Sequence, residues 1–227
     1  MLMKLSERIT NATLRLLFRI FLKINIKEFE KMPKEGPFII IANHTSALDG
    51  PLMYVFMQPR NMVAMAKKEL WNSFATRYLM NLWSSIPVDR ENMERKTLQQ
   101  CFDVLNKNNI LAIAPEGTRS VDGSLQEGKE GVAFIAYKQK APMVPIVTIG
   151  LEDAFKKIRR FKRAEVTIKI GKPFEIIQKE GRLDADKRSQ IIDEVMGRLK
   201  DLLPPSMHGY YADKEIQYLL THNIDLN

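Results

Sequence analysis

The sequence has 227 residues, enough for one sizeable domain, and nothing in it requires two. Hydrophobic residues make up 45% of the chain and charged residues 27%, the proportions of an ordinary folded protein. The single cysteine, Cys101, excludes an internal disulfide, and the formal charge of +8 favours an anionic partner: a membrane surface, an acidic protein, a phosphate-bearing substrate or nucleic acid.

The first predicted element is an amphipathic helix over Lys4–Ile24. Arg15, Arg19 and Lys23 interrupt its apolar second half, so no run approaches the roughly 20 apolar residues that a membrane span requires. The segment also lacks the plain apolar core and the cleavage site of a secretory signal. The regular spacing places the three cations on one helical face, which is typical of a helix lying in a membrane interface. The alternative is a terminal helix packed on the protein's own core.

Beyond residue 25, short apolar runs alternate with longer helical patterns. The predicted strands are Phe38–Ala42, Asn61–Ala66, Ser85–Val88, Ile110–Ala114, Met143–Ile149 and Glu165–Ile170. The predicted helices are Leu48–Phe56, Asn72–Leu82, Met93–Asn108, Gly128–Lys140, Asp186–Leu202 and Asp213–Leu220. Apolar strands with helices between them indicate an α/β fold with a mostly parallel central sheet that helices cover on both faces. We therefore divide the chain into an amphipathic N-terminal helix, residues 1–25, and a single domain, residues 26–227.

The segment Asn43–Asp49 directly follows the first buried strand of this domain. Ser46 and Asp49 fit a capping box, with Ser46 as the N-cap and Asp49 at the third helical position. A carboxylate there reaches back toward His44, where it can hold one ring nitrogen and leave the other as a base. The alternative is that Asp49 only caps the helix and His44 only packs.

The sequence lacks the signatures of several other catalytic sites. The only other histidines, His208 and His222, lie near the carboxyl end, and no cysteine pair or carboxylate-rich loop accompanies His44, so we expect no metal site. The nucleophile elbow Gly-x-Ser-x-Gly and the phosphate loop Gly-x-x-x-x-Gly-Lys are both absent from the sequence. A serine hydrolase and a nucleotide hydrolase are therefore disfavoured.

A second polar segment, Glu116–Ser120, follows the apolar run Ile110–Ala114. Arg119 can bind a phosphate with two parallel hydrogen bonds, and Gly117-Thr118 allows the backbone to approach the anion closely. Glu116 would orient Arg119 or accept a hydrogen bond from a substrate hydroxyl. The alternative is a surface turn with a local ion pair.

Three further sets of cations are candidates for anion binding. Arg90 follows a predicted strand end, where a solvated arginine is the alternative, and Lys129 opens a predicted helix. Lys156–Arg163 places six cations in eight positions. So dense a block exceeds what solubility requires, although a solvated loop between two strands remains the alternative.

Four segments in this order resemble the sequence blocks of the 1-acyl-sn-glycerol-3-phosphate acyltransferase family, also called lysophosphatidic acid acyltransferases. Asn43–Asp49 resembles the His-x4-Asp block, Ile86–Arg90 the second, Glu116–Ser120 the third and Val144–Ile146 the fourth. The resemblance runs from about residue 18 to about residue 211. In the second block many relatives have glycine where Ser84-Ser85 stands here. The domain over residues 26–227 is thereby identified as an acyltransferase domain.

The resemblance implies a role for each matched residue. His44 would be the general base that takes the proton from the acceptor hydroxyl, and Asp49 would orient His44 and stabilise its charged form. The oxygen would attack an acyl thioester directly, without an acyl-enzyme. Arg90, Glu116 and Arg119 would hold the glycerol phosphate. We expect no cofactor, because the donor is itself a thioester of coenzyme A or acyl carrier protein.

The resemblance also implies where the enzyme works and on what. The reaction expected is acylation of the sn-2 hydroxyl of lysophosphatidate to phosphatidate, with glycerol 3-phosphate or another lysophospholipid as the alternative acceptor. The N-terminal helix would hold the enzyme on the cytoplasmic face of the cell membrane, and an acidic carrier protein would suit the basic block Lys156–Arg163. A nucleic-acid-binding module is disfavoured, because the sequence has no aromatic-interleaved basic ribbon. Intact His44 and Asp49 argue against a membrane-surface protein that has lost activity.

Overall fold

The computed structural model describes residues 5–89, 94–178 and 183–226. Within these residues the strands form one sheet in the order β1-β7-β6-β2-β5-β3-β4, with β8 joined to β6 and β9 joined to β8. The strands are β1 (Leu22–Ile24), β2 (Phe38–Ala42), β3 (Met62–Lys67), β4 (Ile86–Val88), β5 (Ile110–Ile113), β6 (Met143–Ile149), β7 (Ala164–Ile170), β8 (Phe174–Ile176) and β9 (Thr221–Asn223).

The centre of the sheet is parallel. β2 pairs with both β5 and β6 in parallel, with Ile39 opposite Leu111 on one side and Met143 on the other. All five residues of β2 are buried, as expected for a strand that is covered on both faces. β6 and β7 are antiparallel, as are the pairs of β8 with β6 and with β9. The prediction of a mostly parallel central sheet is therefore confirmed.

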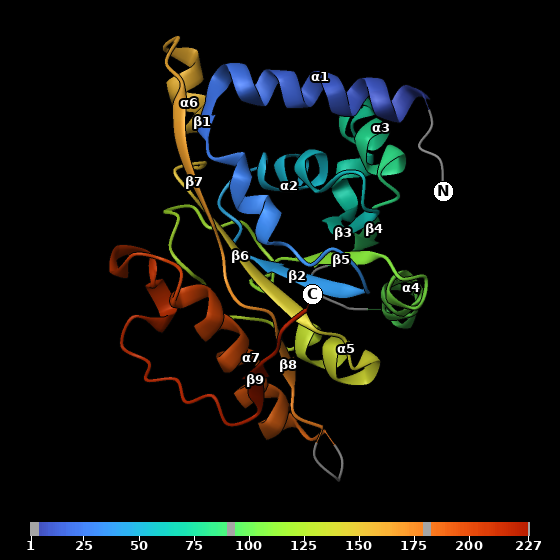
Figure 1. The fold of residues 1–227 in the computed structure, drawn as a ribbon, viewed down its shortest axis with the longest axis vertical. Coiled ribbons are helices and arrows are strands. Elements are labelled where there is room, and N and C mark those ends of the chain that lie inside the picture. Colours follow the sequence, from blue (N-terminus) through green and yellow to red (C-terminus); the bar gives the residue numbers. More distant parts are fainter. Residues whose placement is uncertain (1–4, 90–93, 179–182, 227) are drawn as a thin grey trace.

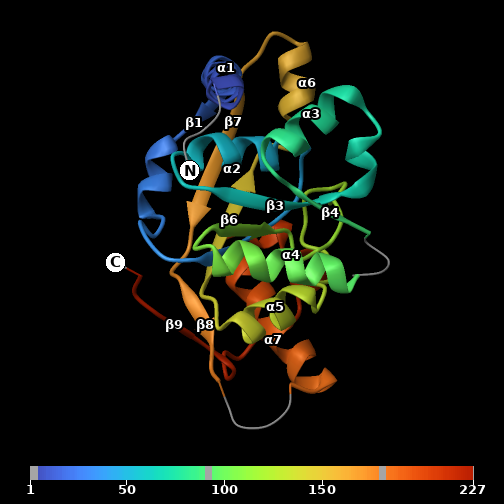
Figure 2. The same ribbon diagram turned by 90° about the vertical axis from the view of Figure 1, so that its right-hand side faces the viewer.

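Helices cover both faces of this sheet (Figures 1 and 2). They are α1 (Leu5–Phe21), α2 (Asp49–Met57), α3 (Phe74–Leu82), α4 (Arg95–Asn106), α5 (Gly131–Gln139), α6 (Ala154–Arg159) and α7 (Ala185–Lys200), with short 3-10 helices at Ile26–Lys31, Lys68–Trp71, Pro205–Met207 and Gly209–Tyr211. Phe38 and Ile40 of β2 belong to the apolar core shared with α1 and α2, whereas Ile39 and Ile41 belong to the core shared with α4, α5 and α7. The alternation of side chains along one strand thus produces two cores.

The N-terminal helix differs from its prediction in length and in the face it exposes. α1 ends at Phe21, because Leu22 pairs with Ala164 of β7 and is buried. Lys23 therefore lies in a strand, where it forms an ion pair with Glu165. Arg15 points inward and donates to the carbonyl of Val55. The single basic face predicted for this helix is wrong. None of the helices in the described ranges has the length and apolar character of a membrane-spanning helix.

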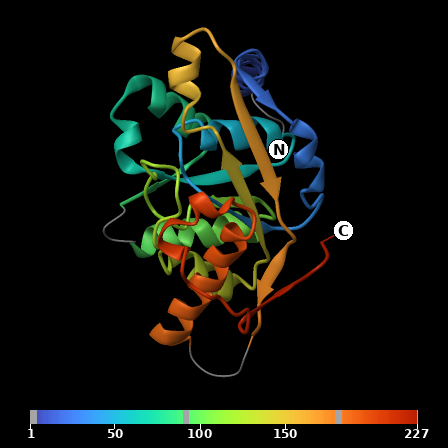
Figure 3. The ribbon, with the colours of Figure 1, turned by 90° about the vertical axis from the view of Figure 1, so that its left-hand side faces the viewer.

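The prediction of a helix over Asp213–Leu220, in the carboxyl-terminal segment, is wrong, because these residues are not helical. Its backbone groups are satisfied instead by side chains of α7. The buried carboxylate of Glu194 accepts hydrogen bonds from the backbone N–H groups of Leu219 and Leu220, and the ammonium of Lys200 donates to the carbonyl of Lys214. The chain then continues as β9 beside β8 (Figure 3), two short strands absent from the prediction. These tertiary contacts override the local helical pattern.

The basic block Lys156–Arg163, for which a solvated loop was the alternative, includes part of a helix, α6, over its first half. The other predicted helices and strands are present, with ends that differ from the predictions by no more than three residues. Ser84 adopts a φ of +52° just after α3. This is the left-handed backbone conformation that glycine favours.

Candidate active site

Three neighbouring strands end at the same edge of the sheet. β2 lies between β5 and β6 and is parallel to both, so their carboxyl ends meet. The segment with His44 follows β2, the segment with Glu116 follows β5, and Thr148 lies near the end of β6. In open α/β sheets, ligands bind at this edge. The fold thus brings His44 to Glu116, 72 positions away in the sequence, and Asp49 to Thr148, 99 positions away.

His44 and Asp49 are in contact at this edge. Nδ1 of His44 is 2.9 Å from Oδ2 of Asp49. The carboxylate is almost fully buried, with a 5% exposed side chain, whereas the imidazole is 25% exposed. A carboxylate beside Nδ1 keeps the proton on that nitrogen and leaves the lone pair on Nε2. Nε2 has no hydrogen-bond partner among the described residues, so it is available to accept a proton.

Three further donors fix the carboxylate of Asp49. The backbone N–H groups of Thr45 and Ser46 donate to Oδ2 at 2.9 and 2.8 Å, and the hydroxyl of Thr148 donates to Oδ1 at 2.9 Å. The side chain of Asn43 accepts from the N–H of Thr148 at 2.9 Å and donates to its carbonyl at 3.0 Å. The carboxylate is therefore held in one orientation, and it orients the imidazole beside it in turn.

Asn43 and Thr148 are parts of the site that the sequence prediction missed. Both are buried, and each makes its main contacts with the other or with Asp49. One signal was present: Thr148 is a hydroxyl-bearing residue near the end of an otherwise apolar strand. A buried polar group at that position requires a hydrogen-bond partner.

The capping box forms in an altered register. α2 begins at Asp49, the residue before it is Leu48, and no side chain caps the helix, so Ser46 is not the N-cap. Of the two side-chain contacts of a capping box, the one from Asp49 back to Ser46 exists, whereas the Ser46 hydroxyl contacts Leu48 in place of Asp49. The Ser46 hydroxyl accepts from the N–H of Leu48 at 3.3 Å, and Asp49 accepts from the N–H of Ser46. A turn at residues 47–48 delays the helix while keeping the backward reach of the carboxylate.

Glu116 supports the backbone of the site. It is only 1% exposed, and its two oxygens accept from the backbone N–H groups of His44 at 2.9 Å and Gln126 at 3.0 Å. Burial raises the pKa of Glu116, and these two hydrogen bonds oppose the shift. The predicted orientation of Arg119 by Glu116 is absent in the described structure, because both carboxylate oxygens are engaged elsewhere. Glu116 instead joins the segment after β2 to the loop after β5.

The remaining candidates of this segment surround the same loop. Gly117 has a φ of +68°, and a side chain on it would meet Cγ of Lys129 at 3.3 Å. The backbone N–H of Lys129 donates to the carbonyl of Pro115 at 2.8 Å, which fixes the position of this lysine. Thr118 and Arg119 are exposed, and Arg119 has no carboxylate partner in the described part of the chain. The loop therefore presents two cations, on Arg119 and Lys129, to solvent.

The arrangement joins a base to nearby positive charge. A base of this kind can take a proton from a hydroxyl group, and an exposed guanidinium and ammonium can bind a phosphate. Arg90, the other predicted anion-binding residue, lies outside the described residues. Within the described ranges, no group of three or more His, Cys, Asp or Glu side chains is placed to hold a metal ion.

The chain is similar in sequence to known acyltransferases. The family model described as Acyltransferase matches residues 23–149. The chain is 32% identical over 152 residues to the 1-acyl-sn-glycerol-3-phosphate acyltransferase of Bacillus subtilis (strain 168), covering 66% of this chain and 73% of that one. It is 31% identical over 140 residues to the enzyme of the same name from Limnanthes alba, covering 60% and 49%.

A solved structure has a similar fold. The crystal structure of the 1-acyl-sn-glycerophosphate (LPA) acyltransferase PlsC from Thermotoga maritima aligns with a TM-score of 0.62 and 23% identity, over 86% of this chain and 79% of that one. This likeness concerns the fold alone. The chain spans about half the length of several of the curated relatives it matches.

Proposed function

Because this chain belongs to the acyltransferase family, we propose that it transfers a fatty acyl chain from a thioester to the sn-2 hydroxyl of 1-acyl-sn-glycerol 3-phosphate, giving phosphatidate. The observation that carries the proposal is the contact between His44 and Asp49, which leaves Nε2 as a free base at the ligand-binding edge of the sheet. The names of the relatives support the choice of acceptor.

The chemical steps use this one base. Nε2 of His44 takes the proton of the acceptor hydroxyl while the oxygen attacks the thioester carbonyl carbon. The tetrahedral intermediate then collapses, the carbon–sulfur bond breaks, and the imidazolium returns the proton to the departing sulfur. Asp49 remains ionised and stabilises the imidazolium between the two transfers. No covalent acyl-enzyme forms, because the acceptor oxygen attacks the donor directly.

Acceptor binding is assigned to the loop after β5. In this proposal the cations of Arg119 and Lys129, both exposed, bind the phosphate, and Gly117 and Thr118 supply a close backbone approach. Arg90 is proposed as a third cation. Glu116 acts through the backbone that it supports, as a positioning residue.

The donor and the location follow from the same scheme. The donor is a fatty acyl thioester, of either coenzyme A or acyl carrier protein. The acceptor and product are lipids, so the enzyme works at a membrane surface, and we place it on the cytoplasmic face. Exposed apolar side chains of α1, among them Leu5, Ile9, Leu16 and Ile20, support contact with that surface.

The test is product analysis with the purified protein in mixed micelles. Oleoyl-lysophosphatidate is supplied with oleoyl-coenzyme A or oleoyl-acyl carrier protein, and glycerol 3-phosphate and lysophosphatidylcholine serve as competing acceptors. We expect phosphatidate, with release of one thiol for each acyl group transferred. Acylation of glycerol 3-phosphate in preference to lysophosphatidate would contradict the assigned acceptor.

A further inference from the structure

The turn after α6 holds an aromatic residue in an unfavourable backbone conformation. The N–H of Phe161 donates to the carbonyl of Ile158 at 2.9 Å, and the N–H of Lys162 donates to the carbonyl of Lys157 at 3.0 Å. This is the Schellman motif, whose left-handed position is usually glycine. Phe161 occupies that position with a φ of +55°. A side chain with a Cβ atom raises the conformational energy there.

Packing within the chain does not offset this strain. The Phe161 side chain is 102% exposed, so its ring projects fully into solvent. Phe155, at the other end of α6, is also exposed. An aromatic ring that is held outward from a strained position requires a reason beyond folding, since strained residues persist mainly where they serve a function.

Unpaired cations flank Phe161 in the sequence. Arg159, Arg160 and Lys162 are exposed, and none has a carboxylate partner in the described ranges. The neighbouring carboxylates already have partners: Asp153 is paired with Lys156, and Glu165 with Lys23. The turn therefore combines an exposed ring with a surplus of positive charge.

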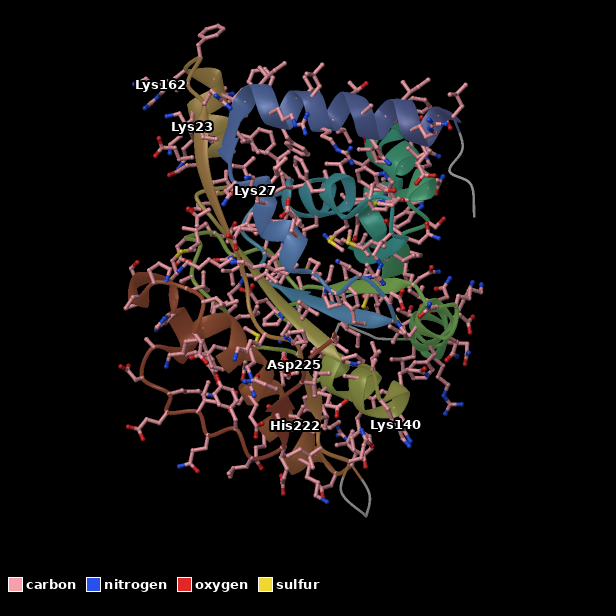
Figure 4. All side chains as sticks on the ribbon, in the orientation of Figure 1. Lys23, Lys27, Lys140, Lys162, His222 and Asp225 are labelled. Carbon is pink, nitrogen blue, oxygen red and sulfur yellow. The ribbon has the colours of Figure 1, made fainter. Side chains whose placement is uncertain are left out.

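This turn is fixed beside the end of α1. Arg163 donates to the backbone carbonyls of Arg19 and Leu22, and Leu22 pairs with Ala164 at the start of β7. Figures 1 and 2 show α6 and α1 at the same end of the molecule, and Figure 4 places Lys162 there. The exposed apolar side chains on the last turns of α1, including Ile20 and Phe21, therefore face solvent at the same end as the Phe161 turn.

We propose that residues 155–163, the aromatic-basic turn, are a second lipid-binding element that acts together with α1 at an anionic bilayer. The Phe161 ring enters the boundary between head groups and acyl chains, while Arg159, Arg160 and Lys162 contact anionic head groups. This inference rests on the proposed function, because the lipid acceptor of that reaction resides in a bilayer. A molecule held by one helix in the interface can rotate about the axis of that helix. Two contacts on separate elements fix its orientation on the bilayer.

The chemistry of the turn favours a bilayer over an acidic protein. Cations alone would suit either partner. A fully exposed ring that is flanked by cations and adjoins an apolar helix face matches the layered polarity of a membrane interface. The basic block then serves the membrane, and docking of an acidic carrier protein becomes the outcome that would contradict the proposal.

The test compares Phe161→Gly with Lys140→Gly in vesicle binding. Both substitutions place glycine at a left-handed position after a helix, since Lys140 has a φ of +48°. Lys140 lies far from α1, at the opposite end of the molecule (Figure 4). We expect Phe161→Gly to fold at least as stably as the wild type yet bind vesicles of phosphatidylcholine and phosphatidylglycerol about tenfold more weakly. Lys140→Gly should bind these vesicles as the wild type does.

Charge is tested with Lys162→Ala beside Lys140→Ala. We expect Lys162→Ala to weaken binding to the phosphatidylglycerol vesicles about fivefold, with no change on vesicles of phosphatidylcholine alone. Equal effects at both lysines, or unchanged binding with Phe161→Gly, would overturn the proposal. A rise in the KM of Phe161→Gly or Lys162→Ala for oleoyl-acyl carrier protein, with vesicle binding unchanged, would also overturn it. Vesicle binding requires no turnover, so the inference can fail or stand separately from the proposed reaction.

Discussion

At the residue scale, the site depends on a carboxylate with four hydrogen bonds. Asp49 accepts from the His44 ring, two backbone N–H groups and the Thr148 hydroxyl. The two backbone bonds come from its own turn, whereas the hydroxyl comes from β6, across the sheet. Thr148 is thus the side chain that joins the local His44–Asp49 unit to the rigid centre of the fold.

We expect Thr148→Val to lower kcat about tenfold, because it removes a hydrogen bond to a buried carboxylate while keeping the shape of the side chain. KM for lysophosphatidate should change little, since Thr148 does not bind substrate in the proposed scheme. Steady-state kinetics in mixed micelles measure both constants. Thr148→Ser keeps the hydroxyl and should restore most of the activity; failure of that rescue would contradict a positioning role.

Glu116 offers a second test at this scale. In Glu116→Gln, the amide NH2 faces one of the two backbone N–H groups that now donate to the carboxylate, so the link between the segment after β2 and the loop after β5 loses one of its two hydrogen bonds. We expect kcat to fall about tenfold, with KM for the acceptor nearly unchanged. The exposed Glu127, on the same loop, is the matched control, and Glu127→Gln should have no such effect. A large rise in KM with constant kcat would instead show that Glu116 binds the acceptor directly.

The sequence predicts the local part of this site better than the distant part. His44 and Asp49 are five residues apart, so turn chemistry alone predicts that the carboxylate reaches back to the ring. Asn43 and Thr148 are 105 residues apart, and their pairing depends on β2 and β6 being neighbours in the sheet. The engagement of Glu116 by two distant backbone N–H groups is equally invisible to local patterns.

At the element scale, buried strands are predictable and terminal segments are not. β2 and β6 have the predicted bounds because a continuous apolar run between turn residues admits one interpretation. The pattern of Asp213–Leu220 also fits a helix, yet Glu194 and Lys200 of α7 supply its hydrogen-bond partners in another conformation. Such partners are known only once the fold is known.

The carboxyl-terminal segment also supports the loop after β5, which carries Glu116 and Lys129. The Tyr211 hydroxyl accepts from the backbone N–H of Gly128, next to Lys129, at 3.0 Å, and the ring is fully buried. Burial raises the pKa of Tyr211 well above its ordinary value, so the hydroxyl stays neutral at physiological pH. The segment from Pro205 to Tyr211 therefore contacts this loop and helps to fix its position.

We expect Tyr211→Phe to lower the free energy of unfolding by about 1 kcal/mol, because it leaves a part-buried backbone N–H without its acceptor. Urea unfolding monitored by circular dichroism measures this change. Tyr210→Phe is the control, since Tyr210 is exposed and its hydroxyl donates to Glu127 at 3.0 Å. Equal stability of the two variants would show that the Tyr211 hydrogen bond does not support the loop.

At the scale of the whole molecule, one sheet joins the end that carries α1 and the aromatic-basic turn to the edge that carries His44 and Asp49. β7 begins just after the aromatic-basic turn and pairs with β6, where Ile168 stands opposite Thr148. The carboxylate of Asp49 is hydrogen-bonded to Thr148 of β6, and β6 pairs with β7, the strand that begins at the proposed membrane contact. The overall charge of +8 agrees with the proposed anionic surface, and six of the cations lie at residues 156–163, within the proposed membrane contact.

The most direct test of the account is the turnover of His44→Ala beside the wild type, with oleoyl-lysophosphatidate and an acyl thioester in mixed micelles. We predict that kcat falls about 100-fold to 10,000-fold while the unfolding transition and vesicle binding remain those of the wild type. Phosphatidate formation by the variant at a rate close to that of the wild type would contradict the assignment of His44 as the base.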